Sequence, residues 1–257
     1  MRHILTIAQT TMRESFRDRV FVGLLFFLLF LLGFSAYIST LSLSDVARVI
    51  QNSGMAGMAL ICLLVTILFG AFSLYREEER QELYVLLNRV SRSSYLLGRF
   101  AGTAMIIILF SLISGGALFL LTFFFGGIPA FGLAWAVLWN ICEFTLLGGV
   151  AFLFYAMGIS FTLNAIMVIG IFIIGHSMTE AVESFIALGR FGSPLHLQSV
   201  KIISYLLPNF DLFDFRLEII HQQPLPRQRV FLALLYWLAY LAALLTAAGA
   251  CFKSRDL

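Results

Sequence analysis

Charged residues are scarce in this sequence. They make up 12% of the 257 residues, whereas hydrophobic residues make up 60%, and a soluble domain usually carries about 25% charged residues. A soluble enzyme of this size would need more polar surface to cover its globule. A disordered chain would need low hydrophobicity and high charge. The composition therefore favours a polytopic membrane protein.

Several chemical signatures are also missing from the sequence. It has no basic stripe of the kind that binds nucleic acid, and no P-loop, H-E-x-x-H or G-x-S-x-G motif. Its three cysteines, Cys62, Cys142 and Cys251, lie in apolar runs and are predicted to be small buried hydrophobes rather than a disulfide framework. We expect no catalytic residue, bound cofactor or metal in this chain, and no nucleic-acid partner.

The apolar runs predict an all-α membrane protein with six transmembrane helices. At 1.5 Å per residue, about 20 residues cross the roughly 30 Å hydrocarbon core. The expected spans are residues 20–38, 54–75, 98–125, 130–158, 160–179 and 230–252. The first run exceeds the roughly 7–15 apolar residues of a signal peptide, which favours a retained helix. Residues 76–97 and 180–229 are the polar segments between spans.

Residues 1–19 predict an amphipathic helix that lies in the membrane interface. Apolar residues recur at helical spacing, and a polar, basic face repeats every four residues. The apolar residues are Ile4, Leu5, Ala8, Met12 and Phe16, and the polar ones are Gln9, Arg13 and Arg17.

An even number of spans puts both termini on one side of the membrane. If that side is the cytoplasm, eleven of the 17 Lys and Arg residues lie inside and six lie outside. The positive-inside rule therefore predicts cytoplasmic termini, with residues 180–229 on the outer side.

Glu143 lies near the middle of the fourth expected span, and Asn140 shares its helix face. A carboxylate at this depth should face the bundle interior or a water-filled cavity. It is either part of a substrate path, together with Asn140 and His176, or a structural hydrogen-bonding group between helices.

His176 allows two further interpretations, both weak. With Glu180 and Glu183 it could bind a metal, but a helix end emerging into water explains these residues better. With Ser160 it could form a hydrolase pair, but 16 residues along one helix separate the two by about 24 Å. That distance is far beyond hydrogen-bond reach.

The segment 76–99 is the most informative stretch. Its charged start is followed by Leu83, Leu86, Leu87 and Val90, which form one apolar stripe on a short helix, and Ser91 or Ser93 can cap the next helix. Such a stripe suits docking of a partner protein, although an amphipathic helix could equally lie on the membrane.

This segment resembles the loop after the second helix in type 2 (exporter-type) ATP-binding-cassette permeases. The similar motifs are Glu79-Arg80, Leu86-Leu87-x-Arg89, Ser91-Arg92-Ser93 and Leu96-Leu97-Gly98-Arg99, together with Arg13-Glu14-x-x-Arg17-Asp18-Arg19 before the first span. Two departures affect the loop conformation: no Gly-Thr follows Arg80, and Val90 replaces a proline. The run at 206–209, Leu-Leu-Pro-Asn, is similar to the subgroup that includes the nitrous oxide reductase maturation permease.

The resemblance implies an elbow helix, six spans, a cytoplasmic coupling helix between helices 2 and 3, and short outer helices before helix 6. It also implies a dimer of permeases, identical or not, in a bacterial inner membrane. Each permease would dock a separate ATPase subunit that binds ATP and Mg²⁺ and drives export of an unidentified substrate. The implied coupling residues are Glu78, Glu79, Arg80, Glu82, Leu83, Leu86, Leu87, Arg89 and Arg92. The alternatives are a membrane scaffold or channel without an ATPase, and an intramembrane enzyme.

Overall fold

The computed structural model describes residues 2–41, 45–79, 90–127, 130–187 and 207–255, with the side chains of residues 2–3 and 178–187 left out. Within these ranges the chain is all helical and contains no strand. The fold class expected from the composition is confirmed at this level.

Five helices are long and apolar enough to cross a membrane. They are α2 (Arg19–Thr40), a continuous helix over Val46–Glu79, α6 (Arg92–Gly126), α7 (Leu133–Ala156) and α11 (Arg227–Ser254). The continuous helix consists of α3 (Val46–Val65), a π-helical segment η1 (Thr66–Ala71) and α4 (Phe72–Glu79). These are the helices of a membrane-embedded protein.

The remaining helices are more varied. The chain begins with α1 (Arg2–Arg17), and α8 (Phe161–Ala187) carries a shorter apolar stretch over Phe161–Ser177. A 3-10 turn η2 (Phe210–Phe213) and the short α10 (Arg216–Ile220) precede α11.

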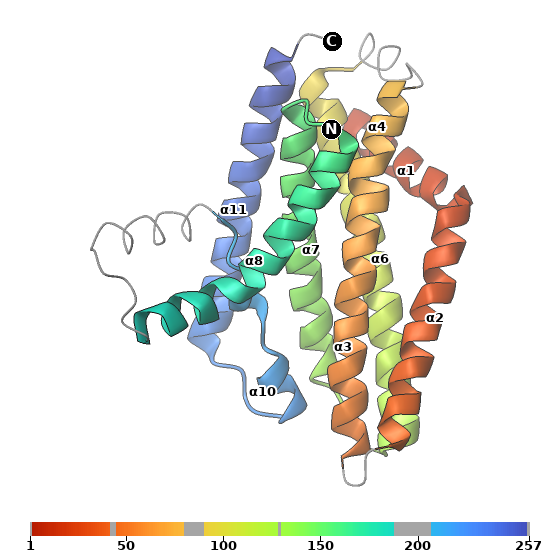
Figure 1. Ribbon diagram of the computed structural model, residues 1–257. Coiled ribbons are helices and arrows are strands. Elements are labelled where there is room, and N and C mark those ends of the chain that lie inside the picture. The colour runs from red at the N-terminus through yellow and green to blue at the C-terminus, as the bar shows by residue number, and fades with distance from the viewer. Residues whose placement is uncertain (1, 42–44, 80–89, 128–129, 188–206, 256–257) are drawn as a thin grey trace.

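The long helices form an elongated bundle, and both chain ends lie at the same end of it (Figure 1). This end, which we call the terminal end, consists of α1, the end of α4, the start of α6, the α7–α8 turn and the end of α11. α8 leaves the bundle at an angle (Figure 1), and α10 lies away from the terminal end.

Local sequence explains where two helices begin. The Asp18 side chain accepts a hydrogen bond from the Val20 amide and caps α2. The Ser91 hydroxyl accepts one from the Ser94 amide and caps α6, as the sequence predicts.

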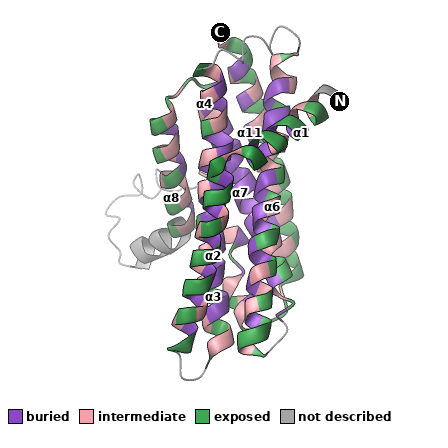
Figure 2. Cartoon of the chain, turned by 90° about the vertical axis from the view of Figure 1, so that its right-hand side faces the viewer, coloured by how far each residue is buried: buried purple, intermediate pink, exposed green. Residues whose placement is uncertain are grey.

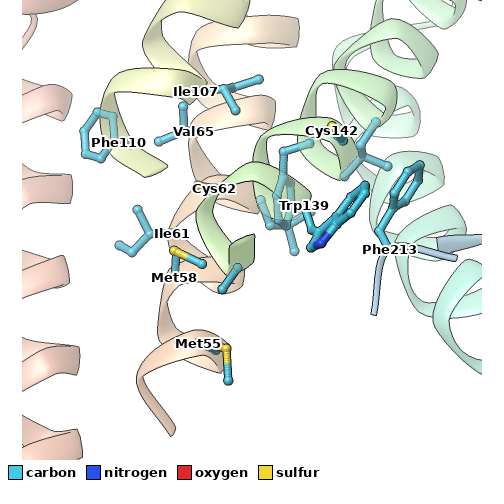
Figure 3. Packing of buried hydrophobic residues seen from close by; sticks show 14 of the residues in the cluster. Met55, Met58, Ile61, Cys62, Val65, Ile107, Phe110, Trp139, Cys142 and Phe213 are labelled. Carbon is cyan, nitrogen blue, oxygen red and sulfur yellow. The ribbon is translucent and has the colours of Figure 1, made fainter. Parts of the chain in front are cut away.

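α7 is the central helix. In its most apolar stretch 72% of residues are buried, against 28% in α2 and 11% in α11, so α2 and α11 lie at the periphery. Buried residues follow the inner faces of the bundle, while α2 shows an exposed outer face (Figure 2). In the core, α3 residues pack against Ile107 and Phe110 of α6 and Trp139 of α7 (Figure 3). Cys62 and Cys142 are buried there as free thiols, whereas Cys251 is partly exposed.

Candidate functional site

Among the described residues, polar side chains gather at the terminal end and around a cavity in the middle of the bundle, and a smaller group surrounds Arg229 near α10. The first begins with the close crossing of α1 and α6. A Cβ on Gly98 would lie 2.8 Å from Ile7 Cβ, and one on Gly102 would lie 2.6 Å from Thr11 Cβ. The small residues at positions 98 and 102 therefore bring two helices into contact within one chain.

The faces of α1 divide into three. Ala8, Thr11 and Ser15 are buried against the bundle, Leu5 and Phe16 are exposed, and the polar residues lie on the remaining side. An exposed apolar strip beside a polar face is typical of a helix at a membrane surface.

A buried ion pair joins α4 to α6 next to this crossing. The Arg99 guanidinium pairs with the Glu77 carboxylate, and both residues are 5% exposed. Tyr95 donates a hydrogen bond to Glu77 Oε2 at 2.5 Å, and Arg99 donates to Thr11 Oγ1 at 2.9 Å and Glu14 Oε2 at 3.2 Å. Both charges are therefore fully engaged between three helices.

A second ion pair ties α4 to the α1–α2 junction. Arg76 Nη1 lies 2.8 Å from Asp18 Oδ2. This hydrogen bond, together with the one from the Val20 amide, lowers the pKa of the Asp18 carboxyl below its usual value.

The opposite side of the terminal end is attached to α11. Glu78 pairs with Arg255 at 2.6 Å. Arg92 donates hydrogen bonds to the carbonyls of Lys253 and Arg255 at 3.1 and 2.7 Å. A guanidinium at a helix C-terminus satisfies carbonyls that have no partner within the helix and interacts favourably with the helix dipole.

Of the coupling residues implied by the resemblance, Glu78, Glu79 and Arg92 lie in the described part of the chain. Arg80, Glu82, Leu83, Leu86, Leu87 and Arg89 lie outside it. The sequence interpretation missed Glu77, Arg99 and Glu14 as a unit. The available signal was Arg99, a permanent charge just inside an apolar run, which needs a partner when buried.

The second site is a cavity of about 330 Å³ between α3, α7, α8 and residues 213–219. Asn140, Glu143 and His176, the three residues singled out within the spans, all line it. Its walls include Met55, Met58, Trp139, Phe172, Phe213 and Phe215, and Asp214 and Arg216 also border it.

Asn140 does not bond to Glu143 although the two share a helix face. Its amide donates to Ser111 Oγ at 2.9 Å and to Cys62 Sγ at 3.1 Å, and so links α7 to α6 and α3. This is the structural role that a buried amide can have between membrane helices.

Glu143 is 9% exposed and so faces the protein interior, as predicted. His176 Nε2 lies 3.3 Å from its Oε1, while Nδ1 of the same ring lies 3.0 Å from the Phe172 carbonyl oxygen. Despite the short distance to the ring, Oε1 has no hydrogen-bond partner, and neither does the buried indole nitrogen of Trp139.

Comparison with models of known protein families and with curated proteins found no match.

The structure places Ser160 immediately before α8 and His176 well inside it, where the ring meets Glu143. The side chains of Glu180 and Glu183, considered with His176 as metal ligands, lie outside the described part. Among the described side chains, no three of His, Cys, Asp or Glu are grouped so that they could hold a metal ion.

Proposed function

We propose that this chain is the permease subunit of an ATP-binding-cassette exporter. The observation that carries the proposal is the attachment of the terminal end on two sides. Residues 80–89 connect α4 to α6. Next to this connection, side chains of α4 and α6 form ion pairs and hydrogen bonds with α1 and the α1–α2 junction on one side and with the end of α11 on the other.

These attachments are what a coupling segment requires. A partner bound to residues 80–89 would pull on α4 and α6, and ion pairs and carbonyl contacts would transmit the movement to α1 and α11. Rigid, connected elements that have two arrangements can carry coupling between distant sites. The sequence motifs at 79–99 point to an ATPase as that partner, and the chain has no P-loop of its own.

In this proposal the membrane layout has six spans, with α8 as the fifth. α1 is the elbow helix, resting against α6 while its strip of Leu5, Met12 and Phe16 contacts lipid. Both termini and residues 76–97 face the cytoplasm of a bacterial cell, in line with the excess of basic residues at the terminal end. Two permease subunits, identical or not, would enclose the path of an exported substrate.

The docking step is tested by replacing both Leu86 and Leu87 with Asp. The two charges would be buried where apolar surface is needed, at a cost of several kcal/mol, and about 4 kcal/mol lowers affinity roughly 1,000-fold. We expect the variant to insert and fold but to lose its ATPase on co-purification from the native host.

The matched control places two Asp residues at Leu41 and Leu217, which are both 71% exposed and lie outside residues 76–97. This control should retain the ATPase. Retention of the ATPase and of ATP-coupled activity by the Leu86/Leu87 variant would refute the docking assignment.

A further inference from the structure

We propose that the cavity between α3, α7 and α8 binds a small organic cation, an amine or quaternary ammonium with an apolar body, and that Glu143 is its counter-ion. This site goes beyond the proposed function and can be tested on the chain alone.

The first argument is the unsatisfied carboxylate. The Glu143 side chain is 11% exposed and the residue lines the cavity, yet its Oε1 accepts no hydrogen bond. Among the described residues, no Lys or Arg nitrogen lies within ion-pair distance of it. A buried carboxylate without a permanently charged partner is costly, and a bound cation would lower that cost.

Among the described side chains, His176 comes within ion-pair distance of Glu143, and its ring can balance the carboxylate only while both ring nitrogens carry a proton. The Phe172 carbonyl can only accept, so Nδ1 carries the hydrogen of their contact. The other ring nitrogen approaches Glu143 Oε1 at 3.3 Å without forming a hydrogen bond. Asp214 and Arg216, which also border the cavity, carry opposite charges that offset each other.

The second argument is the unsatisfied donor. The indole nitrogen of Trp139 is buried and has no acceptor, and the residue lines the same cavity. In Figure 3 this nitrogen lies on the edge of the ring turned away from Phe213. The nitrogen itself is enclosed by protein atoms, so a ligand oxygen or a water would reach it only after a small shift of the neighbouring side chains. Two unpaired groups of opposite hydrogen-bonding type in one cavity point to a ligand rather than to a packing defect.

The third argument is the wall of the cavity. Aromatic rings and the Met55 and Met58 thioethers surround the carboxylate, a combination that attracts organic cations through ring faces and accommodates varied apolar bodies. The volume of about 330 Å³ lies at the lower end of the range for small-molecule sites. Few convergent polar groups within apolar walls are typical of such sites.

The test uses three probes that share a benzyl group: benzyltrimethylammonium, benzyl alcohol and phenylmethanesulfonate. Each is titrated by calorimetry into the purified chain in a non-ionic detergent, with protein-free micelles as the blank. We expect the cation to bind at least tenfold more tightly than the alcohol, and the sulfonate to bind most weakly. Equal binding of all three probes would overturn the proposal, because it would mean that Glu143 carries no effective charge in the cavity.

The variant Glu143→Gln keeps the volume of the side chain and removes its charge. It should weaken binding of the cation at least tenfold and leave the alcohol unchanged. Asp45→Asn removes one exposed carboxylate from the start of α3, outside the cavity, and should leave all three affinities unchanged. A cation preference that survives in Glu143→Gln would assign the counter-ion to another residue and overturn the proposal.

A second measurement needs no variant. An apolar carbodiimide should label Glu143 in the wild-type chain, and benzyltrimethylammonium, but not phenylmethanesulfonate, should protect it. Labelling that is insensitive to the cation would overturn the site. If the wild-type chain binds the cation but does not co-purify with an ATPase from its native host, the cation site stands and the permease proposal alone is weakened.

Discussion

The terminal end and the cavity each contain a buried carboxylate, but the two carboxylates differ in their partners. At the terminal end, Glu77 is paired with Arg99 and accepts a hydrogen bond from Tyr95. In the cavity, Glu143 is a lining residue, and its enclosed Oε1 lacks a hydrogen bond although His176 Nε2 lies 3.3 Å away. Full pairing fixes the geometry of helices, whereas a carboxylate without a Lys or Arg partner leaves a place for the proposed cation.

The same contrast separates their energetics. A buried pair contributes little net stability relative to apolar packing, but removal of one partner leaves the other charge uncompensated. Among the described side chains, Glu143 has the His176 ring but no Lys or Arg within ion-pair distance, so its removal should cost less. Mutations that break pairs at the terminal end should therefore be the most damaging in the molecule.

The largest effect is expected for Arg99→Met. It leaves Glu77 buried without its cation and should lower the free energy of unfolding by about 3–5 kcal/mol. Glu143→Leu should cost clearly less, because it removes an unsatisfied group. The double variant Glu77→Gln/Arg99→Met should recover part of the loss, since neither charge then remains.

The measurement is unfolding in mixed micelles, with the four proteins compared under one condition. If Arg99→Met and Glu143→Leu cost the same, the two carboxylates do not differ as the structure indicates.

Sequence alone predicted the class of fold, but not how the polar residues meet. The expected second span, 54–75, falls within a helix that runs over Val46–Glu79. Hydropathy could not find its start, because Arg48, Gln51 and Asn52 lower the local average while the backbone continues as helix. Gln51 is even buried, at 4% exposure.

For the candidate sites, the sequence could predict only which residues share a face of one helix. Asn140 and Glu143 share a face because they are three residues apart. Their actual contacts, Ser111 and Cys62 for one and His176 for the other, come from other helices and depend on packing. The Glu77–Arg99 pair likewise joins two helices across the segment between them, and no periodicity marks it.

A smaller effect is expected where α1 crosses α6. Gly102→Ala would place a Cβ 2.6 Å from Thr11 Cβ and 3.1 Å from the Ala8 carbonyl oxygen. Overpacking of this kind costs about 1–3 kcal/mol and would push α1 away from the Arg99 cluster. The readout is the unfolding free energy.

Gly116→Ala on the same helix is the control, because a Cβ there meets nothing within 4 Å. Both variants gain the same helix propensity, so their difference isolates the crossing. Equal stability of the two would mean that α1 does not pack against α6 as described.

The smallest effect, and the one that isolates charge from geometry, is expected at Asp18. Its hydrogen bond with Arg76 lowers the pKa of the carboxyl in the folded protein, whereas an unfolded Asp titrates near pH 3.9. The ion pair therefore stabilises the fold fully above that unfolded value, and the stabilisation disappears as the pH falls through the lower, folded value.

Asn still caps a helix well, so Asp18→Asn removes the charge while it keeps the cap. Thermal unfolding of both proteins is measured between pH 3 and 8. Above pH 5 their free energies of unfolding should differ by less than about 1 kcal/mol, as for other partly exposed ion pairs. This difference should shrink toward pH 3. A difference that stays constant down to pH 3 would show that the contribution of Asp18 does not come from its pairing with Arg76. In that case, the attachment of α4 to the α1–α2 junction would depend on the buried Glu77–Arg99 pair instead.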